Sequence, residues 1–220
     1  MQQLPPMGSP AGNEPLTSSE RKRRAILAAA EELFLDAGYL GTSMDEVAAR
    51  AKVSKQTVYA HAGSKEALFV ALVSAMTTGA GDAVHAWDGA EPAVDDDVER
   101  YLREYAERQL AVVLTPRLLR LRRLVIGEVA RFPDLARALY EAGPQRAIAA
   151  MAVAFERLTA RGLLDVADPV EAATTFNWLI MGGPVNEAML LGDDAILAPS
   201  RRRAHARHVV QVFLAAYGVR

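Results

Sequence analysis

Hydrogen-bond donors and positive charges are concentrated between Ser54 and Lys65 in this chain of 220 residues. Hydroxyl, amide, phenol and imidazole groups follow one another here beside two lysines. Side chains of these types bind phosphate oxygens, and amide and lysine groups can also bond to the edges of bases. Between Arg50 and Lys65 there are four basic residues and no acidic one. The segment therefore predicts a local positive field suited to nucleic acid.

Catalytic chemistry has weaker support in this sequence. The chain has four histidines and no cysteine. His205 and His208 could share a metal on one helix face, but no carboxylate or thiolate lies at helical spacing beside them, so we expect a solvated or subunit-facing pair. No nucleophile elbow, glycine-rich phosphate loop or H-E-x-x-H motif occurs. We therefore expect no catalytic residue, no metal site and no cofactor, and keep a helical enzyme only as an alternative.

Two short helices joined by a tight turn are expected to hold the donors in place. Ser43, with Glu46 three residues later, has the spacing of a capping box. One apolar stripe follows at helical spacing: Met44, Val47, Ala48 and Ala51. Ser54 can cap a second, more polar helix in which Val58 faces inward. A polar helix held against an apolar one is typical of a DNA-reading helix-turn-helix, and a solvated surface hairpin is the weaker interpretation.

The segment from Arg23 to Phe69 resembles the DNA-binding domain of the TetR family of bacterial transcriptional regulators. The matching positions are Gly38-Tyr39, Thr42-Ser43, Val47-Ala48, Val53-Ser54, Thr57-Val58-Tyr59 and Ser64 to Phe69. Ala62 differs, because a large apolar residue, often Phe, usually stands there. The resemblance implies a three-helix DNA-binding module over residues 20–66.

Position in this motif, together with donor chemistry, assigns the DNA contacts. We expect Lys55, Gln56 and Thr57 at the groove, where they can reach base edges. The other residues assigned to the interface, mostly to phosphate or sugar, are Thr42, Ser43, Ser54, Tyr59, His61 and Lys65. The basic run from Arg21 to Arg24 opens the first helix and is either a phosphate contact or a solvated helix start.

A second stretch, from Leu124 to Gly192, resembles the C-terminal domain of one TetR subgroup. The matching residues are Glu128, Arg131 to Leu135, Gly143-Pro144, Arg161-Gly162 and Asp168-Pro169. This resemblance implies a regulatory body that dimerises and often encloses a small-molecule pocket.

The rest of the chain predicts an all-α fold with a disordered arm over residues 1–19 and a larger C-terminal domain over residues 67–220. Gly38 should end the first helix, and a long helix should begin at Lys65. We expect a break from Gly79 to Asp97. Prolines should open the later helices, at Pro116, Pro133, Pro144, Pro169 and about Pro199, and the segment Gly182-Gly183-Pro184 should interrupt one of them.

Composition limits the partners. Hydrophobic residues make up 51% of the chain and the formal net charge is −2, so any affinity for nucleic acid must come from a local patch. Neither a signal-like start nor an apolar run of about 18 residues is present, and we expect a soluble, cytoplasmic protein without membrane contact.

Two further expectations concern assembly and ligand. The helices near 169–191 and 199–217 look apolar on more than one face, which predicts a homodimer that binds a near-palindromic double-stranded operator. Residues in excess of one core stripe are Phe176, Leu179, Ile180, Met189, Leu190, Val209, Val210, Phe213 and Tyr217. A pocket for a hydrophobic or amphipathic effector should lie in the body, with Trp87, Tyr105, Leu124, Glu128, Phe155, Trp178 and Met181 as candidate liners. A regulator without a small effector is the alternative.

Overall fold

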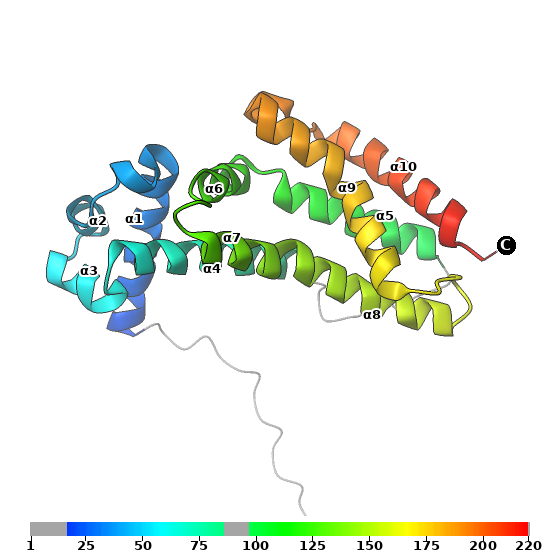
Figure 1. Cartoon of the computed structure of the whole chain (residues 1–220), viewed down its shortest axis with the longest axis horizontal. Coiled ribbons are helices and arrows are strands. Elements are labelled where there is room, and N and C mark those ends of the chain that lie inside the picture. The colour runs from blue at the N-terminus through cyan, green and yellow to red at the C-terminus, as the bar shows by residue number, and fades with distance from the viewer. Residues whose placement is uncertain (1–16, 86–96, 220) are drawn as a thin grey trace, which may run out of the picture.

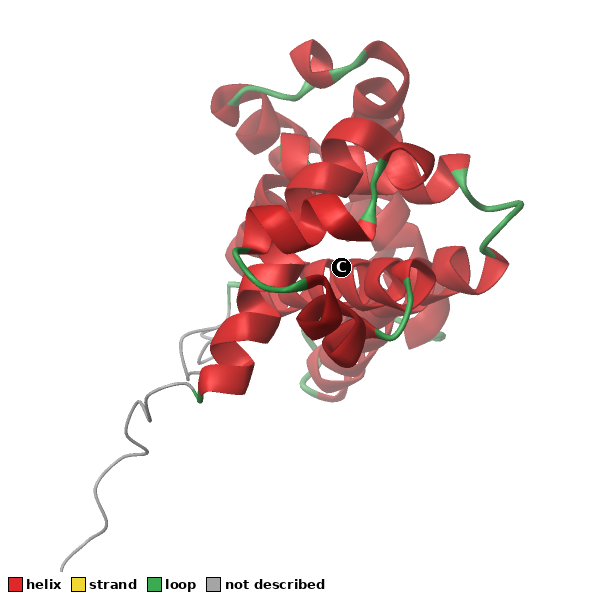
Figure 2. Cartoon of the chain, turned by 90° about the vertical axis from the view of Figure 1, so that its left-hand side faces the viewer, coloured by secondary structure: helices red, strands yellow, loops and turns green. Residues whose placement is uncertain are grey.

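The structure, a computed structural model, describes residues 17–85 and 97–219 (Figure 1). All regular elements in these two ranges are helices, which confirms the all-α prediction, and the one β feature there is an isolated bridge between Leu164 and Gly218 (Figure 2). Most of the predicted N-terminal arm and the predicted pocket residue Trp87 lie outside the described residues.

A small module of three helices occupies one end of the molecule. It consists of α1 (Ser18–Gly41), α2 (Met44–Ala51) and α3 (Lys55–Ala62), and α4 (Lys65–His85) leads from it into the body (Figure 1). Gly38 takes a φ of 72° and ends the regular part of α1, as predicted. At the start of α2 the Ser43 hydroxyl and the Glu46 carboxylate cap each other's backbone N–H groups, so the predicted capping box is present.

The body contains the remaining helices, folded back along one another. They are α5 (Val98–Val113), α6 (Pro116–Gly127), α7 (Pro133–Tyr140), the π-helical turn η1 (Glu141–Gln145), α8 (Arg146–Ala160), α9 (Pro169–Leu191), the 3₁₀ turn η2 (Asp193–Ala195) and α10 (Pro199–Tyr217). Three fully buried phenylalanines, Phe155, Phe176 and Phe213, stack at the centre of α8, α9 and α10 with ring centroids 4.8–5.8 Å apart.

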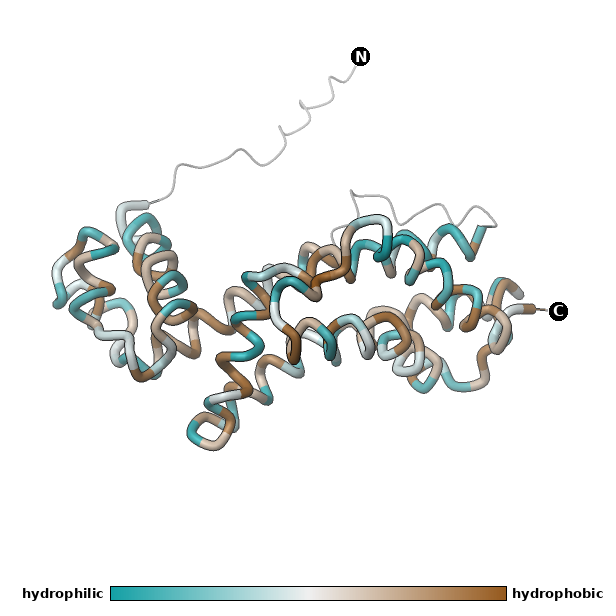
Figure 3. The backbone as a smooth tube through the Cα atoms, turned by 90° about the horizontal axis from the view of Figure 1, so that it is seen from above, coloured by the Kyte–Doolittle hydropathy of each residue, from teal (hydrophilic) through white to brown (hydrophobic). Residues whose placement is uncertain are grey.

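The hydrophobic core of the module continues into the body. Phe34, Val58 and Phe69 are fully buried in it, and the same cluster includes Leu121 of α6 and Leu135 of α7. Seen from above, hydrophobic residues are distributed over both the module and the body (Figure 3). The module and the body therefore pack against each other through one hydrophobic cluster, and a displacement of α6 or α7 would change the packing of the module.

Helix α4 is also the one helix in the described ranges that is long and apolar enough to cross a membrane, by length and composition alone. In this fold 39% of its most apolar window is buried against the rest of the protein. Its apolar residues thus have partners here, among them Leu68, Leu72 and Met76 in the module's core and Val84 in the body's core.

Three of the predicted helix boundaries are wrong because helix packing overrides local propensity. Helix α4 continues through Gly79 as far as His85, so the predicted break does not begin at Gly79. Pro144 does not open a helix but lies inside η1, whose wider turn accommodates a residue without an N–H group. Pro184 is buried inside α9, which runs unbroken from Pro169 to Leu191.

His205 explains how α9 tolerates Pro184. A proline at position 184 cannot donate to the carbonyl of Ile180, four residues earlier. The Nε2 atom of His205, from α10, lies 3.0 Å from this carbonyl oxygen and replaces the missing donor when it carries the proton. His205 is therefore half-buried and bonded within the chain, which corrects the expectation of a solvated or subunit-facing residue, whereas His208 is exposed.

Candidate nucleic-acid interface and interior cavity

The polar face of α3 is presented to solvent at the end of the module. The hydroxyl of Ser54 accepts from the backbone N–H of Thr57 at 3.1 Å and lies 2.8 Å from the hydroxyl of Thr57, so both side chains hold the start of the helix. Val58 is fully buried beneath it, while Gln56 and Tyr59 are exposed, Tyr59 by 43%. This gives a short helix with one seated side and one free polar side.

Acidic residues from outside the predicted basic segment partly neutralise it. Nζ of Lys55 lies 2.8 Å from a carboxylate oxygen of Asp45 on α2, which raises the pKa of Lys55. Arg50 likewise pairs with Glu32 on α1. Carboxylates from α1 and α2 therefore offset part of the positive field predicted from residues 50–65. Both pairs are largely exposed, and such pairs are weak enough to be exchanged for phosphate.

Thr42 has a different role from the one predicted. Its side chain is 3% exposed and its hydroxyl donates to the carbonyl of Gly38 at 2.9 Å, so it stabilises the turn after α1 and does not offer a free phosphate contact. The neighbouring Ser43 is exposed, but its hydroxyl donates to Glu46 at 2.7 Å, and this bond lowers the pKa of Glu46. The capping role of Ser43 is predicted by its spacing to Glu46, whereas the structural role of Thr42 is missed when donor type alone is considered.

Lys65 and the start of α1 border the same face. Nζ of Lys65 lies 4.6 Å from the centre of the Tyr39 ring and 3.4 Å from the carbonyl oxygen of Leu40, which directs the charge at the module's surface. A hollow separates the first turn of α1 from α3. It is lined by Ser18, Ser19, Lys22, Gln56, Thr57, Ala60 and His61, so the structure brings part of the basic run beside the predicted reading residues.

A cavity of about 260 Å³ lies in the interior of the body, bordered by all the helices from α4 to α9. Its wall is mainly aliphatic, with Val84, Leu119, Leu121, Val125 and Met181 among the lining residues. Its size is near the lower end of small-molecule sites, which measure roughly 300–1,000 Å³. Six side chains with polar atoms interrupt the wall: Thr77, His85, Gln109, Arg122, Tyr140 and Asn177.

Of the six predicted pocket residues that lie within the described ranges, only Met181 is found in the wall of this cavity. Phe155 is fully buried in the phenylalanine core, Tyr105 is buried against Phe176, and Trp178 is 42% exposed on the outside of α9. These three predictions are wrong, because the aromatic side chains are used for the core or the surface.

The two predicted residues of α6 point elsewhere as well. Leu124 packs against the module's core, and Glu128 follows the last turn of α6, 3.9 Å from Arg131. The face of α6 that borders the cavity is instead formed by Leu118, Leu119, Leu121, Arg122, Val125 and Ile126. The sequence alone could not distinguish these faces, since α6 is apolar toward both the module and the cavity.

Gln109 and Asn177 form a buried amide pair in the cavity wall. They are 3% and 4% exposed, and Nε2 of Gln109 donates to Oδ1 of Asn177 at 2.9 Å. Oε1 of Gln109 and Nδ2 of Asn177 have no hydrogen-bond partner. Exchanging N and O in both amides gives the same result, so one donor and one acceptor are left over in either assignment. The signal in the sequence is a polar residue within the apolar stripe that contains Leu102, Tyr105 and Ala106.

The two basic groups of the wall, His85 and Arg122, are both affected by burial. Burial lowers the pKa of His85, and the nearby positive charges of Arg146 and Arg108 lower it further, against the opposite effect of Asp82. Burial also lowers the pKa of Arg122, although a guanidinium stays protonated at any physiological pH.

Helices α9 and α10 retain an exposed apolar surface, but it is smaller than predicted. Phe176, Ile180, Val209, Val210 and Phe213 are buried in the core of the body and are not available to a second subunit. The exposed apolar residues on these helices are Val170 (59%), Trp178 (42%), Leu190 (75%), Leu191 (73%) and Val212 (43%).

Comparisons with known proteins identify families for both parts of the chain, the three-helix module and the body that contains the cavity. Residues 26–72 match the family described as bacterial regulatory proteins, tetR family, and residues 100–219 match the AefR-like transcriptional repressor C-terminal domain. The chain belongs to the TetR family of bacterial transcriptional regulators, and it is a DNA-binding transcriptional regulator. Family members bind DNA operators and form dimers.

Individual relatives extend this similarity over the whole chain. A TetR-family regulator from Mesorhizobium loti MAFF303099 is 39% identical with a TM-score of 0.83, over 93% of this chain and 100% of that chain. The flavonoid-responsive regulator FrrA is 33% identical with a TM-score of 0.74, over 91% and 98%. The transcriptional activator FasR from Mycolicibacterium smegmatis is 45% identical over 69 residues, and this match spans only 31% of the length of either protein.

Proposed function

We propose that this regulator is a repressor that binds a palindromic operator as a homodimer and leaves it when a small hydrophobic or amphipathic ligand enters the cavity. The observation that carries the ligand is the Gln109–Asn177 pair, which is buried in the cavity wall with an unused donor and an unused acceptor. Buried polar atoms without partners are costly, and a guest with matching groups would satisfy both.

The similarities support the same reading. The C-terminal region resembles a domain named for a repressor, and the relative FrrA is named for its response to flavonoids. FasR is named an activator, but its match covers only 69 residues, 31% of this chain. A regulator that needs no small ligand is the second candidate, favoured only if the cavity accepts no guest.

Two contacts could carry a change at the cavity to the module. Helix α6 borders the cavity through Leu119 and Arg122, and its first turn reaches α1, where Arg117 pairs with Glu31 through an Nη2–Oε2 contact of 2.8 Å. Beyond the end of α6, Phe132 lies 4.6 Å from Tyr39, measured between ring centroids. Helix α4, which leads from the module into the body, also borders the cavity, so a ligand could act through both helices.

In a dimer, the distance between the two recognition helices determines whether the protein stays bound to DNA. Two recognition helices must be about 34–36 Å apart to enter successive major grooves. A ligand releases DNA only if it binds better to the dimer whose helices are wrongly spaced, since it shifts the equilibrium by its differential affinity. The exposed apolar residues of α9 and α10, Leu190 and Leu191 above all, offer the surface for such a dimer.

The test combines three measurements on the full chain. Sedimentation should show a dimer, fluorescence anisotropy should show binding to a palindrome in the protein's own promoter region, and some apolar compounds from a thermal-shift screen should weaken this binding. A monomer at every concentration would refute the dimer. Compounds that neither stabilise the protein nor affect DNA binding would remove the ligand and leave the ligand-independent regulator.

A further inference from the structure

Helix α6 has four arginines, and the partner of each can be compared. Arg117 pairs with Glu31 of α1. Arg120 and Arg123 both pair with Asp193 of η2, at 3.7 and 3.1 Å, and Arg123 also donates to the carbonyl of Ala188 at 2.7 Å.

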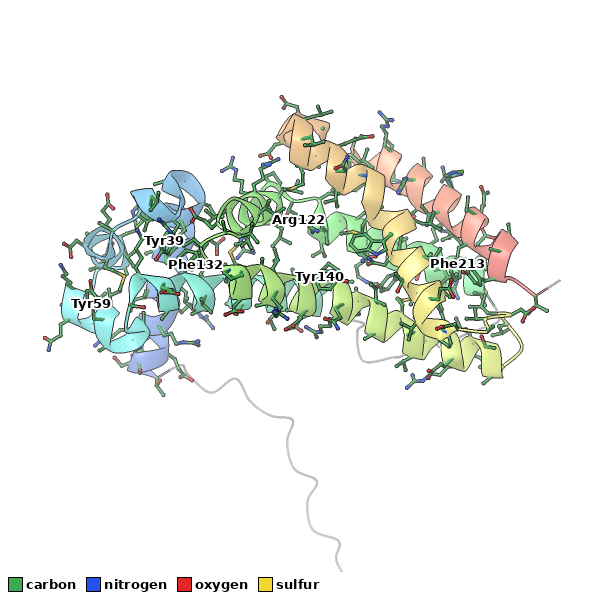
Figure 4. All side chains as sticks on the ribbon, viewed as in Figure 1. Tyr39, Tyr59, Arg122, Phe132, Tyr140 and Phe213 are labelled. Carbon is green, nitrogen blue, oxygen red and sulfur yellow. The ribbon has the colours of Figure 1, made fainter. Side chains whose placement is uncertain are left out.

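Arg122 differs from the other three. It lines the cavity, and no residue in the described part of the chain accepts a hydrogen bond from its guanidinium or forms an ion pair with it. Figure 4 shows Arg122 on the side of α6 that faces the body and not the DNA-binding module. A partly buried guanidinium loses part of its hydration, and only an anion or several hydrogen-bond acceptors compensate for this loss. An unpaired arginine in a largely apolar wall is therefore suited to bind an anionic ligand.

We propose that the effector is an amphipathic monocarboxylate, whose carboxylate pairs with Arg122 while a hydroxyl or carbonyl group elsewhere on the molecule bonds to Gln109 and Asn177. This inference rests on the proposed ligand-responsive function and names the chemical class of the ligand.

The charge of the ligand follows from the wall. A carboxylate matches the two parallel N–H groups of a guanidinium and binds them in a bidentate manner. His85 is the other basic group of the wall, and burial together with Arg108 and Arg146 lowers its pKa, so it adds no second positive charge at neutral pH. A phosphate monoester, with close to two negative charges, would be left short of one cation.

The body of the ligand follows from the same wall. Aliphatic residues such as Val84, Leu121 and Val125 surround the space between the polar groups, which favours a hydrocarbon chain or an aromatic ring. The amide pair offers one donor and one acceptor, which suits a hydroxyl group because a hydroxyl both donates and accepts.

The test compares acids with their neutral methyl esters. The probes are octanoate, 4-phenylbutyrate and 4-hydroxycinnamate, each with its methyl ester, titrated calorimetrically into the full chain and then into its complex with operator DNA. We expect the acids to bind about tenfold to hundredfold more tightly than the esters, as is typical of a hydrogen-bonded charge, and to release DNA in the same order. The hydroxylated acid should bind more tightly than the others.

Matched variants separate the charge at the cavity from charge in general. Arg122→Met should abolish the preference for acids while the esters still bind, and Arg122→Lys should keep part of it. Arg120→Met removes an equal charge from the exposed side of the same helix and should leave the preference intact. Ester binding by Arg122→Met also reports that this variant is folded.

Each outcome decides between the two proposals. Esters that bind and release DNA as well as the acids would overturn the carboxylate and leave the ligand-responsive function standing. An acid preference that survives in Arg122→Met would overturn the role of Arg122. A protein to which neither acids nor esters bind would overturn both this inference and the proposed function.

Discussion

Replacing one or both members of the Gln109–Asn177 pair tests whether the cavity wall is built around unsatisfied polar groups. The two side chains are almost fully buried and share a hydrogen bond of 2.9 Å. In Asn177→Leu, which keeps the side-chain volume nearly constant, Gln109 loses this bond and both polar atoms of its amide are left unpaired. The same argument applies to Gln109→Met. Each single substitution should lower the free energy of unfolding by about 1–3 kcal/mol.

The double variant should behave differently. Removing both amides together also removes the two atoms that have no partner in the native protein, Oε1 and Nδ2. Apolar replacement of both partners is nearly neutral or stabilising. The double variant should therefore be at least as stable as the native chain, although two destabilising changes that act independently would add up.

Thermal unfolding followed by circular dichroism is a suitable assay. In a chain of this size about 1 kcal/mol shifts Tm by roughly 2–4 °C, so the single variants should melt several degrees lower and the double variant at or above the native value. Additive losses in the double variant would refute the coupling. The double variant should also lose the preference for a hydroxylated guest, which connects the stability measurement to the cavity.

Three predictions concern DNA and pH. Lys65→Ala should weaken binding to all DNA sequences and reduce the salt slope by about one unit, whereas Lys55→Ala should relax base preference. Anisotropy titrations on operator and scrambled DNA measure both effects. Unchanged binding by both variants would contradict these roles. Asp45→Asn should tighten operator binding by up to about fivefold, because it frees Lys55 from an exposed and therefore weak ion pair. His85 has a folded-state pKa below its unfolded value of about 6.5. The stability that this group contributes is therefore complete above about pH 6.5 and is lost as the pH falls from there through the folded-state pKa. His85→Gln should reduce the acid-induced fall in Tm.

Local signals in the sequence were sufficient for the module. The capping box of Ser43 and Glu46, the end of α1 at Gly38 and the seating of Val58 each depend on residues close together in the chain. The all-α fold likewise follows from helical periodicity.

Long-range contacts decided what could not be predicted. Pro184 looks like a helix breaker until His205, 21 positions later, supplies the missing donor to Ile180. Lys55 looks like a free cation until α2 brings Asp45 beside it. The sequence predicts a ligand site lined largely by aromatic residues, but Tyr105 and Phe155 are buried in the core and Trp178 lies on the surface. The informative residues are the polar ones that interrupt apolar stripes.

Phe132 provides a test of how the cavity communicates with DNA. It stands between α6 and α7, packed edge-on against Tyr39 at 4.6 Å and near Phe69 at 6.0 Å, so it joins the body to the module's core. Phe132→Leu keeps an apolar side chain but removes both aromatic contacts, worth about 0.5–1.5 kcal/mol each. Because these contacts join two parts that each have a core of their own, the variant should still fold and bind operator DNA.

What Phe132→Leu should lose is the effect of the ligand on DNA affinity. The measured quantity is the ratio of operator dissociation constants with and without a saturating ligand, which is the coupling between the two sites. Arg117→Met tests the other contact between the same two parts, because it removes the partly exposed ion pair with Glu31, and such pairs contribute less than a buried aromatic contact. We expect the ratio to fall toward one in Phe132→Leu and to change much less in Arg117→Met. An unchanged ratio in Phe132→Leu would mean that the signal leaves the cavity through α4 instead. Helix α4 could carry this signal because its residues pack in the core of the module and, at Val84, in the core of the body.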